Sequence, residues 1–386
     1  MEVKIEKLDH YGRGIGKINN KTVFVNNALE NEIVEIKITK EKKNFCEATV
    51  CKYIKTSEKR KIPICPYYEL CGGCQLLHLS YEEQLKFKEN KVKEILKKFA
   101  NIKEDIIKPI VKSEEEYYYR NKITLQVDKK IGLYQEKSND IIPINYCYLV
   151  SNGMNDSIKD LIKEDFSSYK GNIVIKETTQ KDKLIFYNLN KYYSNPKFIN
   201  KDYILEKMGN FTFKISPQSF FQVNTKQAIK LYQKVKEYAD LKGKEIILDL
   251  YCGTGTIGIF LSEKAKKVIG IEICKEAVED ARENSKINQV NNCEFFCGDA
   301  QIEIEKIKEK VDIIIVDPPR SGLTEREINY FKRLNPQKII YVSCDPITFA
   351  RDLNLLKNDY EIKEITPFDL FPQTYHVECA CILRHK

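Results

Sequence analysis

The second half of the chain alternates short apolar runs with longer amphipathic segments, and this alternation restricts the fold more than any other feature. From about Ser216 onward, segments with helical periodicity separate most of the apolar runs. Such alternation predicts a doubly wound α/β sheet. The last two runs lack a helix-length spacer, so we expect them to form an antiparallel edge. The expected strands cover residues 245–251, 268–273, 294–297, 312–317, 338–343, 361–365 and 377–383.

A glycine-rich turn follows the first of these expected strands. Residues 253–258 read Gly-Thr-Gly-Thr-Ile-Gly, a G-x-G-x-x-G motif between a strand and a helix. Glycines let a ligand approach the backbone, and an acid about 20 residues further on, here Glu272, can accept ribose hydroxyls. Asp299, after the third expected strand, is placed to face an adenine, although a surface aspartate fits equally well. These features suit NAD and S-adenosylmethionine alike.

Cys344 follows the expected strand 338–343 directly and is the candidate nucleophile. Asp345 suits a helix N-cap and Pro346 suits the first helical position. We expect the positive end of that helix to favour the thiolate. A dehydrogenase has no evident use for this cysteine or for the Asp317-Pro-Pro-Arg320 segment at the preceding strand end. The expected donor is therefore S-adenosylmethionine.

Glu378 interrupts the otherwise apolar strand 377–383 and is the candidate general base. One reaction that would use both a thiolate and a base is methylation of a pyrimidine in RNA. Carbon 5 of uracil is a poor nucleophile, and thiolate attack at carbon 6 would make it enolate-like before methyl transfer. A base must then remove the carbon 5 proton. Desolvation would raise the pKa of Glu378 toward the range useful for proton transfer. An exposed edge-strand glutamate is the alternative interpretation.

Three cysteines form a compact C-x5-C-x2-C segment. Cys65, Cys71 and Cys74 lie in a turn-rich stretch, and thirteen cysteines without an export signal indicate metal or catalytic use. Three nearby thiols can bind one metal centre, either an iron–sulfur cluster or structural zinc. A fourth thiolate is required, and spacing does not choose among Cys46, Cys51 and Cys147.

The first half of the chain predicts two further domains. Residues 3–56 alternate short strands with glycine turns, which predicts a small β-barrel that either binds RNA or is an inert basic module. Residues 81–100 predict a basic helix whose lysines form a solvated face. The expected domains are residues 1–56, 57–205 and 206–386.

The charge balance is compatible with a polyanionic partner. The chain has 64 Lys and Arg against 56 Asp and Glu, a net charge of +8. No run approaches the roughly 18 apolar residues of a membrane span, and none resembles a signal peptide. We expect a cytoplasmic protein with no membrane association and no obligate protein partner.

Taken together, the ordered motifs resemble the RNA 5-methyluridine methyltransferases. The resemblance implies an S-adenosylmethionine-dependent RNA (uracil-5-)-methyltransferase whose catalytic domain is α/β, class I and Rossmann-like. Cys344 is implied as nucleophile and Glu378 as base. The implied donor contacts are Gln222, Tyr251, Gly253, Gly255, Thr256, Glu272, Asp299 and Asp317. The motifs that carry the resemblance are Ser216-Pro-Gln-Ser-Phe-Phe-Gln-Val-Asn224, Gly253-Thr-Gly255, Asp317-Pro-Pro-Arg320-Ser-Gly322, Tyr341-Val-Ser-Cys344-Asp-Pro and His376-Val-Glu378-Cys.

The first half extends this resemblance. The barrel resembles the OB-like, RNA-binding TRAM domain, and the α+β central domain with its cysteines resembles the 23S ribosomal RNA branch. That branch implies a [4Fe-4S] cluster held by Cys65, Cys71, Cys74 and Cys147, with zinc as the alternative. The implied partner is RNA, 23S ribosomal RNA first and transfer RNA second, with the target uridine flipped out of its stack. An amino methyltransferase and a non-enzymatic iron–sulfur sensor are the rival hypotheses.

Overall fold

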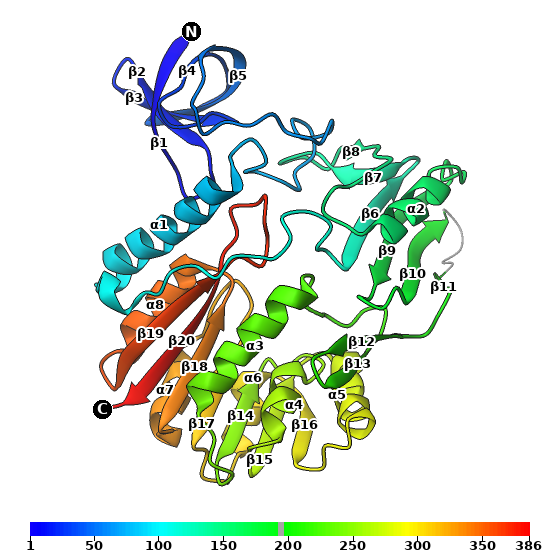
Figure 1. Ribbon diagram of the computed structural model, residues 1–386, viewed down its shortest axis with the longest axis vertical. Helices are drawn as coiled ribbons and strands as arrows, with labels where there is room; N and C mark the ends of the chain where they lie inside the picture. Colours follow the sequence, from blue (N-terminus) through cyan, green and yellow to red (C-terminus); the bar gives the residue numbers. More distant parts are fainter. Residues whose placement is uncertain (192–196) are drawn as a thin grey trace.

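The computed structural model describes residues 1–191 and 197–386. Figure 1 shows a small barrel at the N-terminal end, a second sheet beside it, and a larger sheet flanked by helices that contains the C-terminus. The N-terminal strands form a closed barrel in the order β1-β2-β3-β5-β4, as the sequence predicts. The bounds are β1 (Glu2–Leu8), β2 (Gly14–Ile18), β3 (Lys21–Asn26), β4 (Ile33–Glu41) and β5 (Phe45–Lys55).

A long helix connects the barrel to the C-terminal sheet. Helix α1 (Tyr81–Ala100) buries Val92, Ile95 and Leu96 in the same hydrophobic core as helix α8 (Pro346–Leu356). After the short η1 (Glu104–Ile106), the chain runs beside strand β19 (Tyr360–Phe368), with parallel bridges that link residue 107 to 365 and residue 111 to 368. The segment that leaves the barrel is therefore packed against the C-terminal sheet.

The central sheet has the order β11-β10-β9-β6-β7-β8. Alternate side chains of β6 and β9 share a hydrophobic core with helix α2. A separate hairpin, β12–β13, precedes helix α3. The bounds are β6 (Lys122–Asp128), β7 (Ile131–Tyr134), β8 (Ile141–Ile142), α2 (Asn152–Leu161), β9 (Tyr169–Glu177), β10 (Lys183–Lys191), β11 (Lys197–Ile199), β12 (Ile204–Met208), β13 (Phe211–Ile215) and α3 (Thr225–Ala239).

The C-terminal sheet has the order β16-β15-β14-β17-β18-β20-β19 and confirms the predicted Rossmann-like fold. Strands β14 to β18 are parallel, whereas β20 pairs antiparallel with both β18 and β19, as expected for the edge. The bounds are β14 (Ile246–Leu250), α4 (Thr256–Ser262), β15 (Lys267–Glu272), α5 (Lys275–Ile287), β16 (Cys293–Cys297), α6 (Ala300–Glu303), η2 (Ile304–Lys306), β17 (Ile313–Val316), α7 (Glu325–Leu334), β18 (Lys338–Ser343) and β20 (Glu378–His385).

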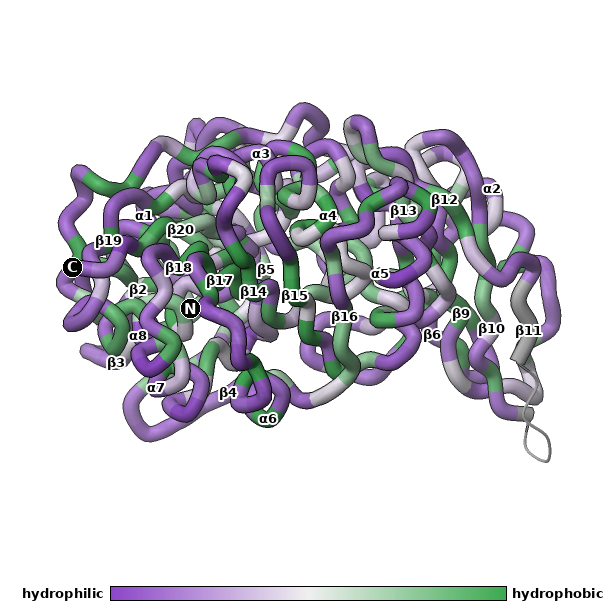
Figure 2. Tube along the Cα trace, turned by 90° about the horizontal axis from the view of Figure 1, so that it is seen from below, coloured by the Kyte–Doolittle hydropathy of each residue, from purple (hydrophilic) through white to green (hydrophobic). Residues whose placement is uncertain are grey.

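Successive side chains of these strands enter two apolar cores, one on each face of the sheet. In β14, Ile247 packs into one core while Leu248 and Leu250 pack into the other. Figure 2 shows hydrophobic residues along β15 and β17 in the interior, with hydrophilic residues prevailing on the outer loops. Over residues 1–191 and 197–386, no helix is both long and apolar enough to span a membrane.

Candidate active site and cysteine site

Three neighbouring strands bring Asp317, Cys344 and Glu378 to one edge of the C-terminal sheet. Asp317 follows β17, and Cys344 follows β18, its parallel neighbour. In the antiparallel pair of β18 and β20, Ser343 lies opposite Cys379. One further step of that register places Cys344 opposite Glu378. Two carboxyl groups therefore lie near the thiol, and their charge acts on its pKa.

The surroundings of Cys344 do not favour the thiolate, contrary to the sequence expectation. Burial, followed by the negative charges of Glu378 and Asp317, raises the thiol pKa to about 12. Asp345 does cap helix α8, because its carboxylate accepts hydrogen bonds from the N–H groups of Ile347 (2.9 Å) and Thr348 (3.1 Å). The negative charge of that carboxylate is a smaller contribution to the rise in the thiol pKa. The prediction of a lowered pKa is wrong.

Glu378 is enclosed by the protein. Glu378 is only 2% exposed, so the alternative of a solvent-exposed edge glutamate does not apply. Burial first, and the charge of Asp317 second, raise the pKa of Glu378 well above its ordinary value, while Arg320 opposes the shift. Burial also raises the pKa of Asp317 to about 7. With a pKa of about 7, the carboxyl group of Asp317 can exchange protons near neutral pH.

The glycine-rich turn leaves space beside its backbone. Gly253 has a φ of 54°, and a Cβ atom there would meet nothing within 4 Å. Gly255 has a φ of 78°, and a Cβ atom there would come within 2.8 Å of Phe295. Glu272, at the end of β15, accepts hydrogen bonds from the N–H of Gly253 (3.1 Å) and of Cys274 (2.8 Å). The predicted ribose acceptor thus lies against the glycine turn.

The other predicted donor contacts, apart from Gln222, lie in the segments that follow the parallel strands. Tyr251 follows β14 with a φ of 63°, and Thr256 begins α4. Asp299 follows β16 and caps α6 by accepting the N–H of Gln301 at 2.8 Å. Gln222 comes from outside the sheet, and its carbonyl accepts the side-chain amide of Asn121 at 2.9 Å.

One acidic residue of this region was not among the sequence candidates. Asp249, the fourth residue of β14, accepts the N–H of Gly258 at 3.1 Å, and its other carboxylate oxygen is buried without a hydrogen-bond partner among the described residues. Burial and the charge of Asp317 raise its pKa to about 8. Its position inside the strand that precedes the glycine motif was the signal that could have identified it.

A small cavity of about 190 Å³ opens beside Cys344. Its walls include Tyr11 of the barrel, Lys91 of α1, and the loop before Glu378 that contains Tyr375. Arg320 borders the same cavity and lies 3.3 Å from the imidazole of His376. The candidate nucleophile is therefore bordered by the barrel turn and helix α1 as well as by C-terminal loops, an arrangement that no local motif predicts.

Helix α1 holds the loop before Glu378 with buried polar side chains. Lys88 forms an ion pair of 2.5 Å with Asp369, and Lys91 donates to the carbonyl of Tyr375 at 3.0 Å. Gln84 donates to the side-chain carbonyl of Gln373 at 2.9 Å. The expectation that the lysines of this helix are all solvated is wrong for Lys88 and Lys91. Their helical spacing with Gln84 and Ile95 was the signal for a buried face.

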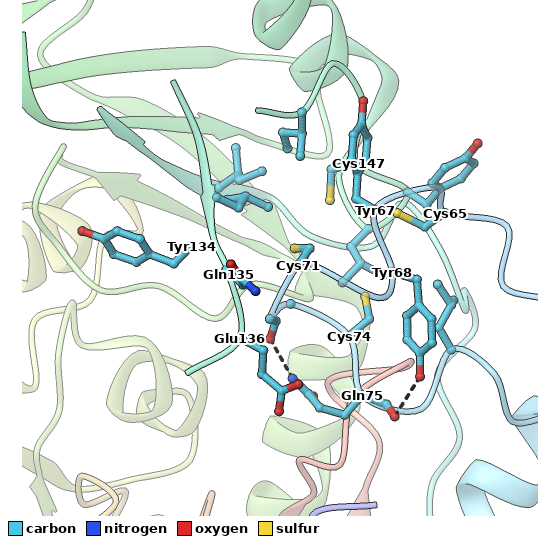
Figure 3. Close-up of a pocket in the computed structure, with 18 of the residues that line it drawn as sticks. Cys65, Tyr67, Tyr68, Cys71, Cys74, Gln75, Tyr134, Gln135, Glu136 and Cys147 are labelled. Carbon is cyan, nitrogen blue, oxygen red and sulfur yellow. Dashed lines mark hydrogen bonds between the residues drawn. The ribbon is translucent and has the colours of Figure 1, made fainter. Parts of the chain in front are cut away.

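The four predicted cysteine ligands border one large cavity of about 1150 Å³. Figure 3 shows the sulfur atoms of Cys65, Cys71, Cys74 and Cys147 around the same part of that cavity. Cys46 is instead buried in the barrel core and Cys51 is exposed on β5. Among the residues described by the structure, no group of three or more His, Cys, Asp or Glu side chains is placed to hold a single metal ion.

Nearby charges and backbone N–H groups act on these four thiols. Burial raises the pKa of each, and the N–H of Gly73 opposes that shift at Cys71. Arg120 lines the same cavity, and its charge opposes the rise in pKa at Cys71, Cys74 and Cys147. The Nε of Arg120 is buried and lacks a hydrogen-bond partner within the described part of the chain. Arg120 is thus a cation beside the sulfur atoms.

Comparison with known proteins is consistent with this geometry. A model of the TRAM domain matches residues 1–51, and a model described as tRNA (Uracil-5-)-methyltransferase matches residues 193–386. An uncharacterized RNA methyltransferase of Clostridium acetobutylicum is 37% identical, with 99% of this chain and 96% of the relative covered. One from Staphylococcus aureus is also 37% identical, with 98% of this chain and 96% of the relative covered.

A solved structure extends the similarity to three dimensions. It is the crystal structure of Pyrococcus abyssi tRNA (uracil-54, C5)-methyltransferase in complex with S-adenosyl-L-homocysteine, which matches with a TM-score of 0.79 and 29% identity. The match covers 99% of this chain and 100% of that chain. The chain belongs to the TRAM-containing family of RNA 5-methyluridine methyltransferases and is an S-adenosylmethionine-dependent RNA (uracil-5-)-methyltransferase.

Proposed function

We propose that this enzyme methylates carbon 5 of a uridine in 23S ribosomal RNA, with Cys344 as nucleophile and Glu378 as general base. The observation that carries the proposal is the convergence of Cys344, Glu378 and Asp317 at three neighbouring strand ends. One sulfur atom and two carboxyl groups are the groups that addition to a pyrimidine and proton removal require.

Cys344 and Glu378 are proposed to act in different steps of the reaction. Cys344 loses its proton to the carboxylate of Asp317, which leaves Glu378 free to act as a base later, and the sulfur forms a bond with carbon 6 that makes carbon 5 nucleophilic. Carbon 5 takes the methyl group as the bond between that methyl group and the donor sulfur breaks, after which the carboxylate of Glu378 removes the carbon 5 proton. The electron pair of that C–H bond restores the ring double bond as the Cys344 sulfur leaves.

The donor residues are proposed to lie around the glycine turn. S-adenosylmethionine supplies the methyl group and, while bound, a sulfonium charge that favours the carboxylate forms of Asp317 and Glu378. Glu272 would accept the ribose hydroxyls, and Asp299 would face the adenine. The space beside Gly253 supports this placement, because no side chain occupies it. The remaining proposed contacts are Gln222, Tyr251, Gly255, Thr256 and Asp317.

Cys65, Cys71, Cys74 and Cys147 are proposed to hold a [4Fe-4S] cluster. Four soft thiolate ligands at one cavity and a backbone N–H directed at Cys71 suit such a cluster. Its proposed role is to hold the central loops in place, since methyl transfer needs no electron. Protein purified without oxygen is expected to be brown and to contain iron. Colourless protein loaded with zinc would overturn the cluster in favour of structural zinc.

Ribosomal RNA is preferred as the substrate because the C-x5-C-x2-C segment resembles the ribosomal branch. Transfer RNA is the second candidate, because the similar Pyrococcus abyssi enzyme is a tRNA methyltransferase. The test is to map 5-methyluridine in both RNAs from cells with and without the gene. We expect a 23S ribosomal site to disappear with the gene. Loss confined to transfer RNA would contradict the ribosomal assignment while preserving the reaction.

A further inference from the structure

The cavity beside Cys344 and the cavity beside the four cysteines meet at two tyrosines. Tyr11 and Tyr375 are the residues that line both cavities. Tyr11 lies in the turn after β1 of the barrel, and Tyr375 lies three residues before Glu378. An extended ligand that reaches from the larger cavity to Cys344 therefore passes these two rings.

The two rings are held as a pair. Their centroids are 5.3 Å apart at 85°, an edge-to-face contact, and Tyr11 remains 50% exposed. The barrel turn is fixed by Asp9, which accepts the N–H of Tyr11 at 2.9 Å and pairs with Arg13 at 2.7 Å. Lys91 fixes the backbone of Tyr375. An exposed aromatic ring on a fixed turn is suited to stacking against a flat ligand.

Positive charges accompany both rings. The guanidinium of Arg13 lies 5.6 Å from the centroid of the Tyr11 ring, and the ammonium of Lys91 lies 4.9 Å from that of Tyr375. Arg320 borders the smaller cavity. Aromatic rings next to cations match a single-stranded nucleic acid, whose bases stack and whose phosphates are anionic. An apolar peptide would bring no anionic group to the charges of Lys91 and Arg320.

We propose that the base adjacent to the target uridine stacks on the Tyr11–Tyr375 pair. This inference rests on the proposed function and adds a specific nucleotide contact to it. The barrel would then form part of the active-site entrance, with Tyr11 as a positioning residue. RNA bound there would fix the barrel turn relative to the loop that leads to Glu378.

The test uses oligocytidylate with one uridine, because that single uridine sets the register on the enzyme. A second and a third probe lack the base on the 5′ or the 3′ side of the uridine. Dissociation constants are measured for the wild type, Tyr11→Ala and Tyr375→Ala. Tyr11→Phe and Tyr375→Phe keep the rings, and Tyr203→Ala is a matched control because Tyr203 is 44% exposed but lines neither cavity.

We expect each alanine variant to bind the intact probe about 5- to 150-fold more weakly, as loss of one stacked base predicts. On one of the two abasic probes the same variants should bind like the wild type, because the stacking partner is already missing. Equal losses on all three probes, or no loss on any, would overturn the inference. Methylation of the intact probe or of cellular RNA is measured separately, so absence of 5-methyluridine would count against the proposed function alone.

Discussion

The chain contains two sulfur sites that differ in the charges around them. At Cys344 the negative charges of Glu378 and Asp317 each act more strongly than the cation of Arg320, whereas the cation beside the four-cysteine site is Arg120. Burial raises the thiol pKa at both sites. Acids near a lone thiol can accept and return protons, while a cation stabilises thiolates that remain ligands. On the proposed roles, the comparison teaches that neighbouring charge, more than burial, would separate the reactive sulfur from the structural ones.

Removing the lone sulfur should produce the largest effect. Cys344→Ala is expected to lower 5-methyluridine formation by at least about 10⁴-fold, because the covalent route is lost. Single-turnover methylation with labelled donor measures this rate. Iron content should not change. Cys51→Ala is the control, because Cys51 is exposed on the barrel. Undiminished methylation by the Cys344 variant would indicate direct transfer without an adduct, as in an amino methyltransferase.

Removing one sulfur of the four-cysteine site should lower the iron content more than the methylation rate. Cys74→Ser is expected to lose most of the bound iron, since a four-thiolate site loses a ligand. Methylation should fall less than in Cys344→Ala, because the nucleophile remains. Iron analysis and visible absorption measure the outcome, with Cys51→Ser as the control. If the variant kept its full iron content, Cys74 would not be a ligand.

Replacing Arg120 tests the charge difference between the sites. Arg120→Met is expected to retain iron about 10- to 100-fold less tightly, the usual effect of removing an outer partner of a metal site. The rate of iron loss to a chelator measures this retention. Arg120→Lys preserves the charge and should lie between the methionine variant and the wild type. Equal rates in all three proteins would show that the cation does not stabilise the site.

The acidic surroundings of Cys344 predict that the methylation rate depends on pH. The pKa of the thiol is raised to about 12 and that of Glu378 is also raised, so the reactive anionic forms increase as pH rises. In the free enzyme, kcat/KM should rise by about tenfold per pH unit through neutral pH wherever thiolate formation limits the rate. Circular dichroism at each pH controls for unfolding. A flat profile would indicate that the thiol is already ionised.

Much of the catalytic fold could be predicted because its strands are local patterns. The strand 338–343 was predicted with its observed bounds, since a buried strand ends where a polar N-cap follows. The glycine turn and Glu272 also follow from their spacing. The motifs predict Asp317 and Glu378 near Cys344, but the raised pKa of the thiol could not be predicted, because burial by distant segments of the chain is its largest cause.

Helix α1 also shows what local sequence patterns do not predict. Its periodicity predicted a helix, but Lys88 and Lys91 are buried only because a loop nearly 300 residues later supplies Asp369 and the carbonyl of Tyr375. Lysines are usually assigned to the solvated face, although the helical spacing of Lys88 and Lys91 with Ile95 also indicates a buried one. A buried lysine depends on a distant partner, and spacing within the helix does not reveal that partner.

The most direct test asks which of the thirteen cysteines bonds to RNA. Glu378→Gln cannot remove the carbon 5 proton, so product release should slow by about 10²- to 10⁴-fold and the adduct should accumulate. The variant is incubated with RNA and S-adenosylmethionine, denatured, and its peptides are mapped by mass spectrometry. The account predicts a methylated nucleotide on Cys344 alone. A nucleotide on another cysteine, or wild-type turnover with no adduct, would contradict it.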